Sequence, residues 1–163
     1  MSDVHAALAI QRRRLSELER ALAEARREEQ RCAAERERCR IESETFRREL
    51  PERERGLYRA LWGNLVKMRD LDEVAVRVAA LRQQGVDMEM VLLEAEQALS
   101  EAAELVAEQS QLYAEQAIRT EKYIEWVRLL DAESEKEREH AEEVEQLDDR
   151  PVVQSSLLGG GMQ

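Results

Sequence analysis

Residues 15–40 read LSELERALAEARREEQRCAAERERCR, and apolar side chains recur in this stretch every seven positions. A second apolar row lies three positions after the first, and both rows continue through most of the chain. A repeat of this period keeps one narrow stripe of a helix turned toward a partner helix, as in a coiled coil. The first row holds Leu8, Leu15, Leu22, Leu50, Leu57, Leu71 and Val78, and the second holds Leu18, Ala25, Cys32, Cys39, Phe46, Ala60, Val74 and Leu81.

The repeat is interrupted most clearly at Gln83-Gln84-Gly85 and then resumes. A glycine between two helical segments allows the chain to reverse on itself. We therefore predict an all-α fold, a single long antiparallel α-helical hairpin over residues 3–147. Its first helix is expected over about 3–83, the turn at about 84–87 around Gly85, and the second helix over about 88–146. The resumed rows hold Leu92, Leu99, Val106, Tyr113 and Val127, and Ala95, Ala102, Tyr123, Leu130 and Val144.

Local breaks in the pattern add three further expectations. Pro51 removes a helical hydrogen bond, but the apolar rows keep their register across it, so we expect a kink rather than a domain boundary. The seam should be weakest between Leu22 and Leu50, where the first row holds polar residues. Residues 148–163 have no period and contain several glycines, which predicts a flexible C-terminal tail. The polar residues of the weak stretch are Glu29, Arg36 and Ser43.

The charge of the chain is unevenly distributed. Charged residues make up 37% of the sequence, and the formal net charge is -11. Residues 1–82 contain 19 Lys and Arg against 16 Asp and Glu, whereas residues 83–163 contain 6 against 20. Opposite charges beside a coiled-coil seam favour pairing of the two helices with each other. The alternative interpretation is that these charges only keep the chain soluble.

Several classes of function are disfavoured. An acidic chain is a poor partner for nucleic acid, and carboxylates on convex helix faces form no pocket for catalysis, so we expect neither an enzyme nor a cofactor. Cys32 and Cys39 lie one heptad apart, but His5 and His140 do not complete a metal site at a suitable spacing. The sequence shows no signal peptide or membrane span, which predicts a cytoplasmic protein without stable membrane insertion.

Apolar residues in excess of one seam are candidates for contact with a partner, because a two-helix hairpin buries only one stripe of each helix. The first such group is the candidate partner-binding patch Leu57, Tyr58, Leu61, Trp62, Leu65 and Val66. A second excess lies in Tyr123–Leu130. Trp and Tyr are enriched in binding hot spots. The alternative is that the broad stripe only seals the two-helix core.

The stretch from Leu57 to Arg82 carries a family resemblance. Its residues Leu57-Tyr58, Leu61, Leu65-Val66, Leu71-Asp72-Glu73-Val74 and Val78-Ala79-Ala80-Leu81-Arg82 resemble the central part of the YscO family of type III secretion proteins, relatives of the flagellar FliJ. The resemblance implies a central stalk in the hexameric export ATPase that also contacts the export gate and secretion chaperones, peripheral to the inner-membrane apparatus. It also implies that the end holding both termini, with Arg12, Arg13, Arg14, Glu135 and Glu139, faces the ATPase. The patch from Leu57 to Val66 would then contact the gate or a chaperone.

Two other functions remain open from the sequence. The chain could be a generic coiled-coil scaffold that pairs with itself or with another helical protein. It could also be a helical chaperone whose apolar excess holds an export partner. An elongated monomer in solution is expected for a hairpin that satisfies its own seam, whereas an obligate dimer is expected for the scaffold.

Overall fold

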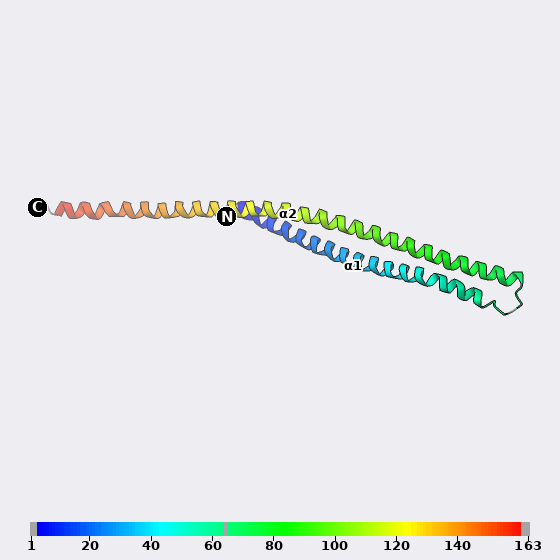
Figure 1. Cartoon of the computed structure of the whole chain (residues 1–163). Helices are drawn as coiled ribbons and strands as arrows, with labels where there is room; N and C mark the ends of the chain where they lie inside the picture. The colour runs from blue at the N-terminus through cyan, green and yellow to red at the C-terminus, as the bar shows by residue number, and fades with distance from the viewer. Residues whose placement is uncertain (1–2, 64, 161–163) are drawn as a thin grey trace. The chain divides into compact units, whose positions relative to one another are not determined.

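The computed structural model describes residues 3–63 and 65–160, with side chains up to Asp148, and consists of two long helices (Figure 1). Helix α1 is Asp3–Arg59 and helix α2 is Met68–Gly160. The helices pack against each other in opposite directions on either side of one turn, and the described residues contain no β-strand. The predicted all-α helical hairpin is therefore confirmed.

The turn lies between Arg59 and Met68, so the prediction of a turn at residues 84–87 was wrong. Gly63 has a φ of 82°, in the left-handed region that a residue with a Cβ rarely adopts. At the start of α2, the backbone N–H of Lys67 donates to Oδ2 of Asp70 at 3.2 Å. This bond satisfies an amide before the first helical turn, as in half of a capping box. The first helix thus ends about 24 residues, or nearly seven helical turns, earlier than its apolar rows suggested.

Gly85 lies inside α2, where it makes room for an aromatic ring of α1. A Cβ built on Gly85 would lie 3.2 Å from Cε1 of Phe46. Phe46 itself is buried. A glycine inside a helix costs only about 1 kcal/mol relative to alanine, which a long helix tolerates. The glycine that suggested a turn is therefore a packing residue of the seam.

The ends and interior of the helices also differ from expectation. Helix α1 continues through Pro51, as expected for a proline that does not mark a domain boundary. Helix α2 continues to Gly160, so its predicted end near Gln146 was wrong. Of the predicted tail, residues 161–163 lie outside the described residues. The predicted end was placed where the apolar period stops. That period shows where a helix packs against a neighbour, and a helix can continue beyond such packing.

The chain divides into two compact units, and the larger, unit 2, is Leu18–Leu112. Its core is a seam of small and medium apolar side chains with one aromatic ring, and the predicted rows supply it. Leu71 and Ala60, also predicted for these rows, are exposed because they flank the turn. Ser43 is buried in the stretch that was expected to be weakest. The buried apolar residues of unit 2 are Leu22, Ala25, Cys39, Phe46, Val74, Val78, Ala95 and Ala102.

Unit 1 combines Met1–Glu17 with Tyr113–Gln163. Its seam contains Leu8 and a buried polar cluster, which we call the glutamine cluster: Gln11, Gln116 and Thr120. Nε2 of Gln116 donates to Oε1 of Gln11 at 2.8 Å and to Oγ1 of Thr120 at 3.2 Å. Farther along, Nε2 of His5 lies 3.2 Å from Oδ1 of Asp131. Beyond this contact α2 has no segment of α1 beside it, and every residue from 128 to 148 is exposed.

Candidate functional site

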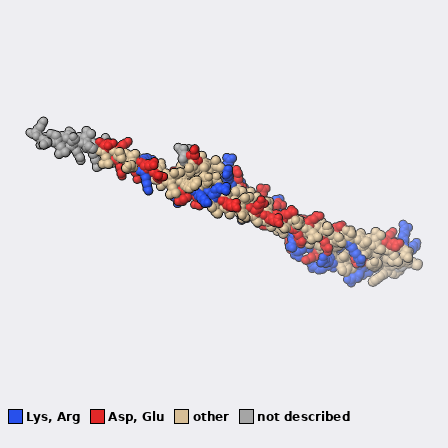
Figure 2. Space-filling view, turned by 90° about the horizontal axis from the view of Figure 1, so that it is seen from above, with Lys and Arg blue, Asp and Glu red and all other residues tan. Residues whose placement is uncertain are grey.

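The predicted partner-binding patch lies at the turn of the hairpin. Trp62 is 73% exposed and Leu65 is 99% exposed, while Leu57 and Leu61 are half-buried. Tyr58 and Val66 are also exposed, and Met68 and Leu71 extend the apolar surface onto the first turns of α2. Figure 2 shows a largely uncharged surface at this end of unit 2, on the right of the view, with basic side chains beside it. The turn therefore presents large apolar side chains that the hairpin itself does not cover.

The local sequence explains why these side chains point outward. The backbone N–H groups of Leu61 and Trp62 donate to the carbonyl oxygens of Tyr58 and Arg59 at 3.0 and 3.1 Å, which tightens the end of α1. Gly63 then reverses the chain with its positive φ. Residues 60–63 and 65–67 of the connection belong to neither helix, and all of them except Leu61 are exposed. An open groove beside the patch is lined by Tyr58, Ala75, Val78, Ala79, Arg82, Gln83 and Val86.

The residues predicted to face an ATPase lie in unit 1 and are exposed. Arg12, Arg13 and Arg14 are on α1, and Nε of Arg13 lies 3.5 Å from Oε1 of Glu17. Glu135 and Glu139 are on the part of α2 that follows its contact with α1. Glu135 accepts a hydrogen bond from Arg138, which lowers the pKa of the glutamate carboxyl. The ion pair of Arg13 thus lies within α1, and the ion pair of Glu135 lies within α2.

Cross-helix ion pairs border the seam of unit 2. Oε1 of Glu54 accepts from Nε of Arg82 at 2.8 Å, and Nη2 of Arg47 donates to Oε1 of Glu89 at 2.7 Å. The hydrogen bond from Arg82 lowers the pKa of Glu54. These contacts join a mildly basic helix to an acidic one: α1 contains 15 Lys and Arg and 13 Asp and Glu, whereas α2 contains 9 and 23. The complementarity expected from the sequence is therefore present.

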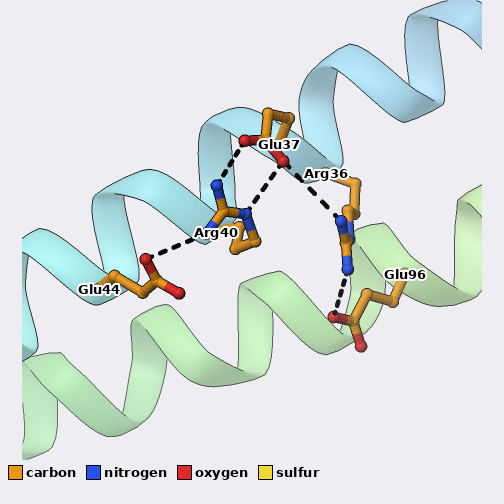
Figure 3. Close-up of polar contacts among 5 residues, drawn as sticks. All are labelled: Arg36, Glu37, Arg40, Glu44 and Glu96. Atoms are coloured by element: carbon orange, nitrogen blue, oxygen red, sulfur yellow. Dashed lines mark hydrogen bonds and ion pairs between the residues drawn. The ribbon is translucent and has the colours of Figure 1, made fainter.

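Figure 3 shows how such a border is built. Nη2 of Arg36 on α1 lies 3.8 Å from Oε1 of Glu96 on α2, and its Nη1 lies 3.8 Å from Glu37. Arg40 bridges Glu37 and Glu44 one turn to either side. Hydrogen bonding to Arg40 lowers the pKa of Glu37. Exposed pairs of this kind contribute about 0–1 kcal/mol each, so they align the helices more than they stabilise them.

The described residues contain no group of three or more His, Cys, Asp and Glu side chains able to hold a metal ion. Cys32 and Cys39 are free thiols, and burial is the main cause that raises the pKa of each. Each thiol donates to the glutamate one turn before it, Glu28 and Glu35, at 3.6 Å. No helix within the described part of the chain is long and apolar enough to span a bilayer.

The glutamine cluster and the position of the turn differ from the sequence predictions. The glutamine cluster was not predicted, although Gln11 and Gln116 occupy positions of the apolar rows and could have been identified by extending the heptads through polar residues. The turn could have been placed by Gly63-Asn64, because Gly and Asn together are a stronger turn signal than the lone Gly85. The long apolar rows on either side of the turn concealed it.

Comparison with known proteins supports the family resemblance. The sequence matches the family described as Type III secretion protein YscO over residues 8–149, which includes nearly all of α1 and most of α2. Neither a curated protein nor a solved structure matches the chain significantly. The match covers well over half of the sequence. The chain therefore belongs to the YscO family of type III secretion proteins.

Proposed function

We propose that this protein is a non-enzymatic coiled-coil stalk and adaptor that binds the hexameric export ATPase of a type III secretion system and couples it to the export gate or to secretion chaperones. Given the family, the proposal rests on two exposed surfaces of different chemistry, one apolar and one charged. The turn of unit 2 exposes a patch of large apolar side chains, including Trp62 and Leu65. In unit 1, residues 128–148 of α2 are exposed and strongly acidic.

The apolar patch is suited to a specific, partly buried contact. Aromatic and aliphatic side chains that project from a rigid turn make hot spots when a partner covers them. We assign this patch to the export gate or to a secretion chaperone. The surrounding basic residues Arg59 and Lys67 would favour an acidic border on that partner.

The charged surfaces of unit 1 are suited to a weaker contact with the ATPase. Arg12, Arg13, Arg14, Glu135 and Glu139 are solvated and carry both signs of charge. A shallow electrostatic interface allows exchange among the equivalent subunits of a ring, whereas a large apolar interface would hold one subunit. The protein would then act as a soluble component at the cytoplasmic side of the inner-membrane apparatus.

The first test is the turnover of the purified cognate export ATPase with and without an equimolar amount of this protein. We expect faster turnover and more hexamer, and both effects should weaken as salt shortens the Debye length from about 10 to about 3 Å. No change in turnover and no co-migration at low salt would reject the ATPase as partner. The protein would then be a coiled-coil scaffold.

The assignment of the patch has a separate test. Trp62→Ala with Leu65→Ala should abolish binding to the cytoplasmic part of the gate protein or to a chaperone while ATPase stimulation is retained. Ile41→Ala with Leu105→Ala is the matched control, because both are exposed apolar residues of unit 2 outside the patch. Loss of ATPase stimulation with intact gate binding would reverse the assignment of the two surfaces.

A further inference from the structure

Helix α2 carries a second apolar stripe on the side away from α1. Val78, Leu81 and Leu92 face the seam and are buried or half-buried. Val76 is 68% exposed and Met90 is 53% exposed on the same stretch of helix. The exposed residues recur at alternating spacings of three and four, as in a coiled-coil seam. This outer stripe consists of Val76, Ala79, Gln83, Val86, Met90 and Leu93.

The outer stripe is unusual because it contains no charge. Exposed positions of a solvated coiled coil normally carry charged residues, and 37% of this chain is charged. One of the two comparable outer rows of α1 is mostly basic: it holds Arg13, Arg20, Arg27, Ala34, Ile41, Arg48 and Arg55. Solubility alone therefore does not account for the apolar side chains on α2. A helix with two apolar stripes on nearly opposite sides can pack against two helices at once.

An open groove lies beside the stripe. It is lined by Ala79, Gln83 and Val86 of the stripe and continues to Tyr58 and Arg82. Small side chains such as Ala79 let a second backbone approach closely, while Val86 and Leu93 supply apolar surface above them. The stripe spans five turns of helix, from residue 76 to 93, which is enough to pair with two to three heptads of a partner helix.

The borders of the stripe indicate the charge of its partner. On one border, Arg82 is hydrogen-bonded to Glu54 of α1, and Glu89 is hydrogen-bonded to Arg47 of α1. The other border, at the next positions around the helix, holds Glu73, Ala80, Asp87 and Glu94, and Asp87 accepts a hydrogen bond from Nε2 of Gln83 in the stripe at 3.0 Å. A partner that places Lys or Arg beside this border gains attraction, and one that places Asp or Glu there is repelled.

The same borders disfavour a second copy of this chain. In an antiparallel pair of stripes related by a two-fold axis, the acidic border of one copy would lie next to the acidic border of the other. In a parallel pair, Glu89 would lie next to Glu94 of the other copy while Arg82 would lie next to Asp87, so repulsion and attraction cancel. Neither arrangement gains as much as a partner that places Lys or Arg along the acidic border.

We infer that the outer stripe of α2 is a docking surface for an amphipathic α-helix of another protein, whose apolar heptad residues are bordered by Lys or Arg. Docking would produce a three-helix layer in which α2 is the central helix. The inference goes beyond the proposed function, because the outer stripe lies outside both the turn patch and the charged surfaces of unit 1, and only the groove beside it reaches Tyr58 of the patch.

The probe is a 21-residue synthetic helix with Leu at both heptad core positions and Lys at both border positions, so that it does not pair with itself. The matched peptide has Glu in place of Lys. We expect the Lys peptide to bind the full chain at least tenfold more tightly than the Glu peptide. Methyl resonances of Val76, Val86 and Met90 should shift, since the peptide lies on them. Equal affinity of the two peptides, or shifts confined to Leu65 or Leu129, would overturn the inference.

Variants complete the test. Met90→Glu should weaken binding of the Lys peptide at least tenfold with unchanged helix content, because Met90 is exposed and makes no part of the seam. Ile118→Glu is the control, since Ile118 is an exposed residue at the equivalent heptad position in unit 1, outside the stripe. Undiminished binding by the Met90 variant would refute the stripe as the site. Self-association of the wild-type chain that Met90→Glu abolishes would identify a second copy as the occupant and refute the basic partner.

Discussion

The two units of the hairpin close their seams in different ways. In unit 2 the buried positions are apolar apart from Ser43, and the ring of Phe46 fits against the bare backbone of Gly85. In unit 1 the buried positions include Gln11, Gln116 and Thr120, joined by hydrogen bonds. Apolar residues of similar size stabilise a seam in more than one alignment, whereas a buried polar group tolerates only the alignment that satisfies it.

The difference suggests separate roles for the two seams. Unit 2 supplies most of the apolar burial, and its alignment is fixed by the Phe46–Gly85 fit and by ion pairs at its borders. Unit 1 has less apolar burial, and its buried residues Gln11, Gln116 and Thr120 favour a single register of the two helices. A hairpin of repetitive sequence needs such a device, because a shift by one heptad would otherwise bury nearly the same residues.

The largest effect should come from the aromatic residue of the apolar seam. Phe46→Ala removes a ring that fills the space over Gly85 and leaves a cavity, so we expect a loss of about 3–4 kcal/mol in the free energy of unfolding. The measurement is urea denaturation followed by circular dichroism at 222 nm. Phe46→Leu, which keeps part of the volume, should lose less. An unchanged midpoint for Phe46→Ala would mean that this fit does not hold unit 2 together.

A smaller effect is expected from the glutamine cluster. Gln116→Leu alone leaves the side-chain amide of Gln11 without its donor, which should destabilise unit 1 by about 1–2 kcal/mol. Replacing both Gln11 and Gln116 by Leu should be neutral or stabilising, because no buried polar partner is then left unpaired. Amide hydrogen exchange of residues 3–17 and the urea midpoint provide the readouts.

The outcome separates alignment from stability. If the double variant is more stable but populates more than one register, observed as several sets of resonances for Leu8, the cluster acts as an alignment device. If Gln116→Leu alone raises the protection of residues 3–17 against amide hydrogen exchange, the hydrogen bonds of the glutamine cluster do not stabilise unit 1. The two seams would then not differ in how they are held together.

The fold class followed from the sequence because a seven-residue apolar period has a direct structural meaning. The rows through Leu22, Phe46, Val78 and Ala95 are the seam that the structure buries. The turn did not follow, because the period reports which side of a helix is covered and not where the covering helix begins. Leu57 and Leu71 continue one row across the turn, so the pattern alone could not locate it.

The candidate surfaces were predictable only in part. The patch from Leu57 to Val66 was identified as an apolar excess, and its exposure results from a turn that the sequence reasoning had placed elsewhere. The outer stripe of α2 is visible in the sequence only as a second apolar row at the same period, which Val76, Val86 and Met90 belong to.

The smallest effect concerns the border of the apolar seam. The hydrogen bond from Arg82 lowers the pKa of Glu54, so the bond stabilises the fold above the ordinary glutamate pKa and the contribution is lost as the pH falls through the lowered value. Arg82→Ala should raise the Glu54 pKa in a carboxyl NMR titration while the urea midpoint changes little, since the guanidinium is exposed. Arg47→Ala is the control, because Arg47 bonds to Glu89 and should leave the titration of Glu54 unchanged. A Glu54 pKa that is unchanged in Arg82→Ala would show that this bond does not form in solution, and the Phe46–Gly85 fit and the Arg47–Glu89 pair would be left as the contacts that set the register of unit 2.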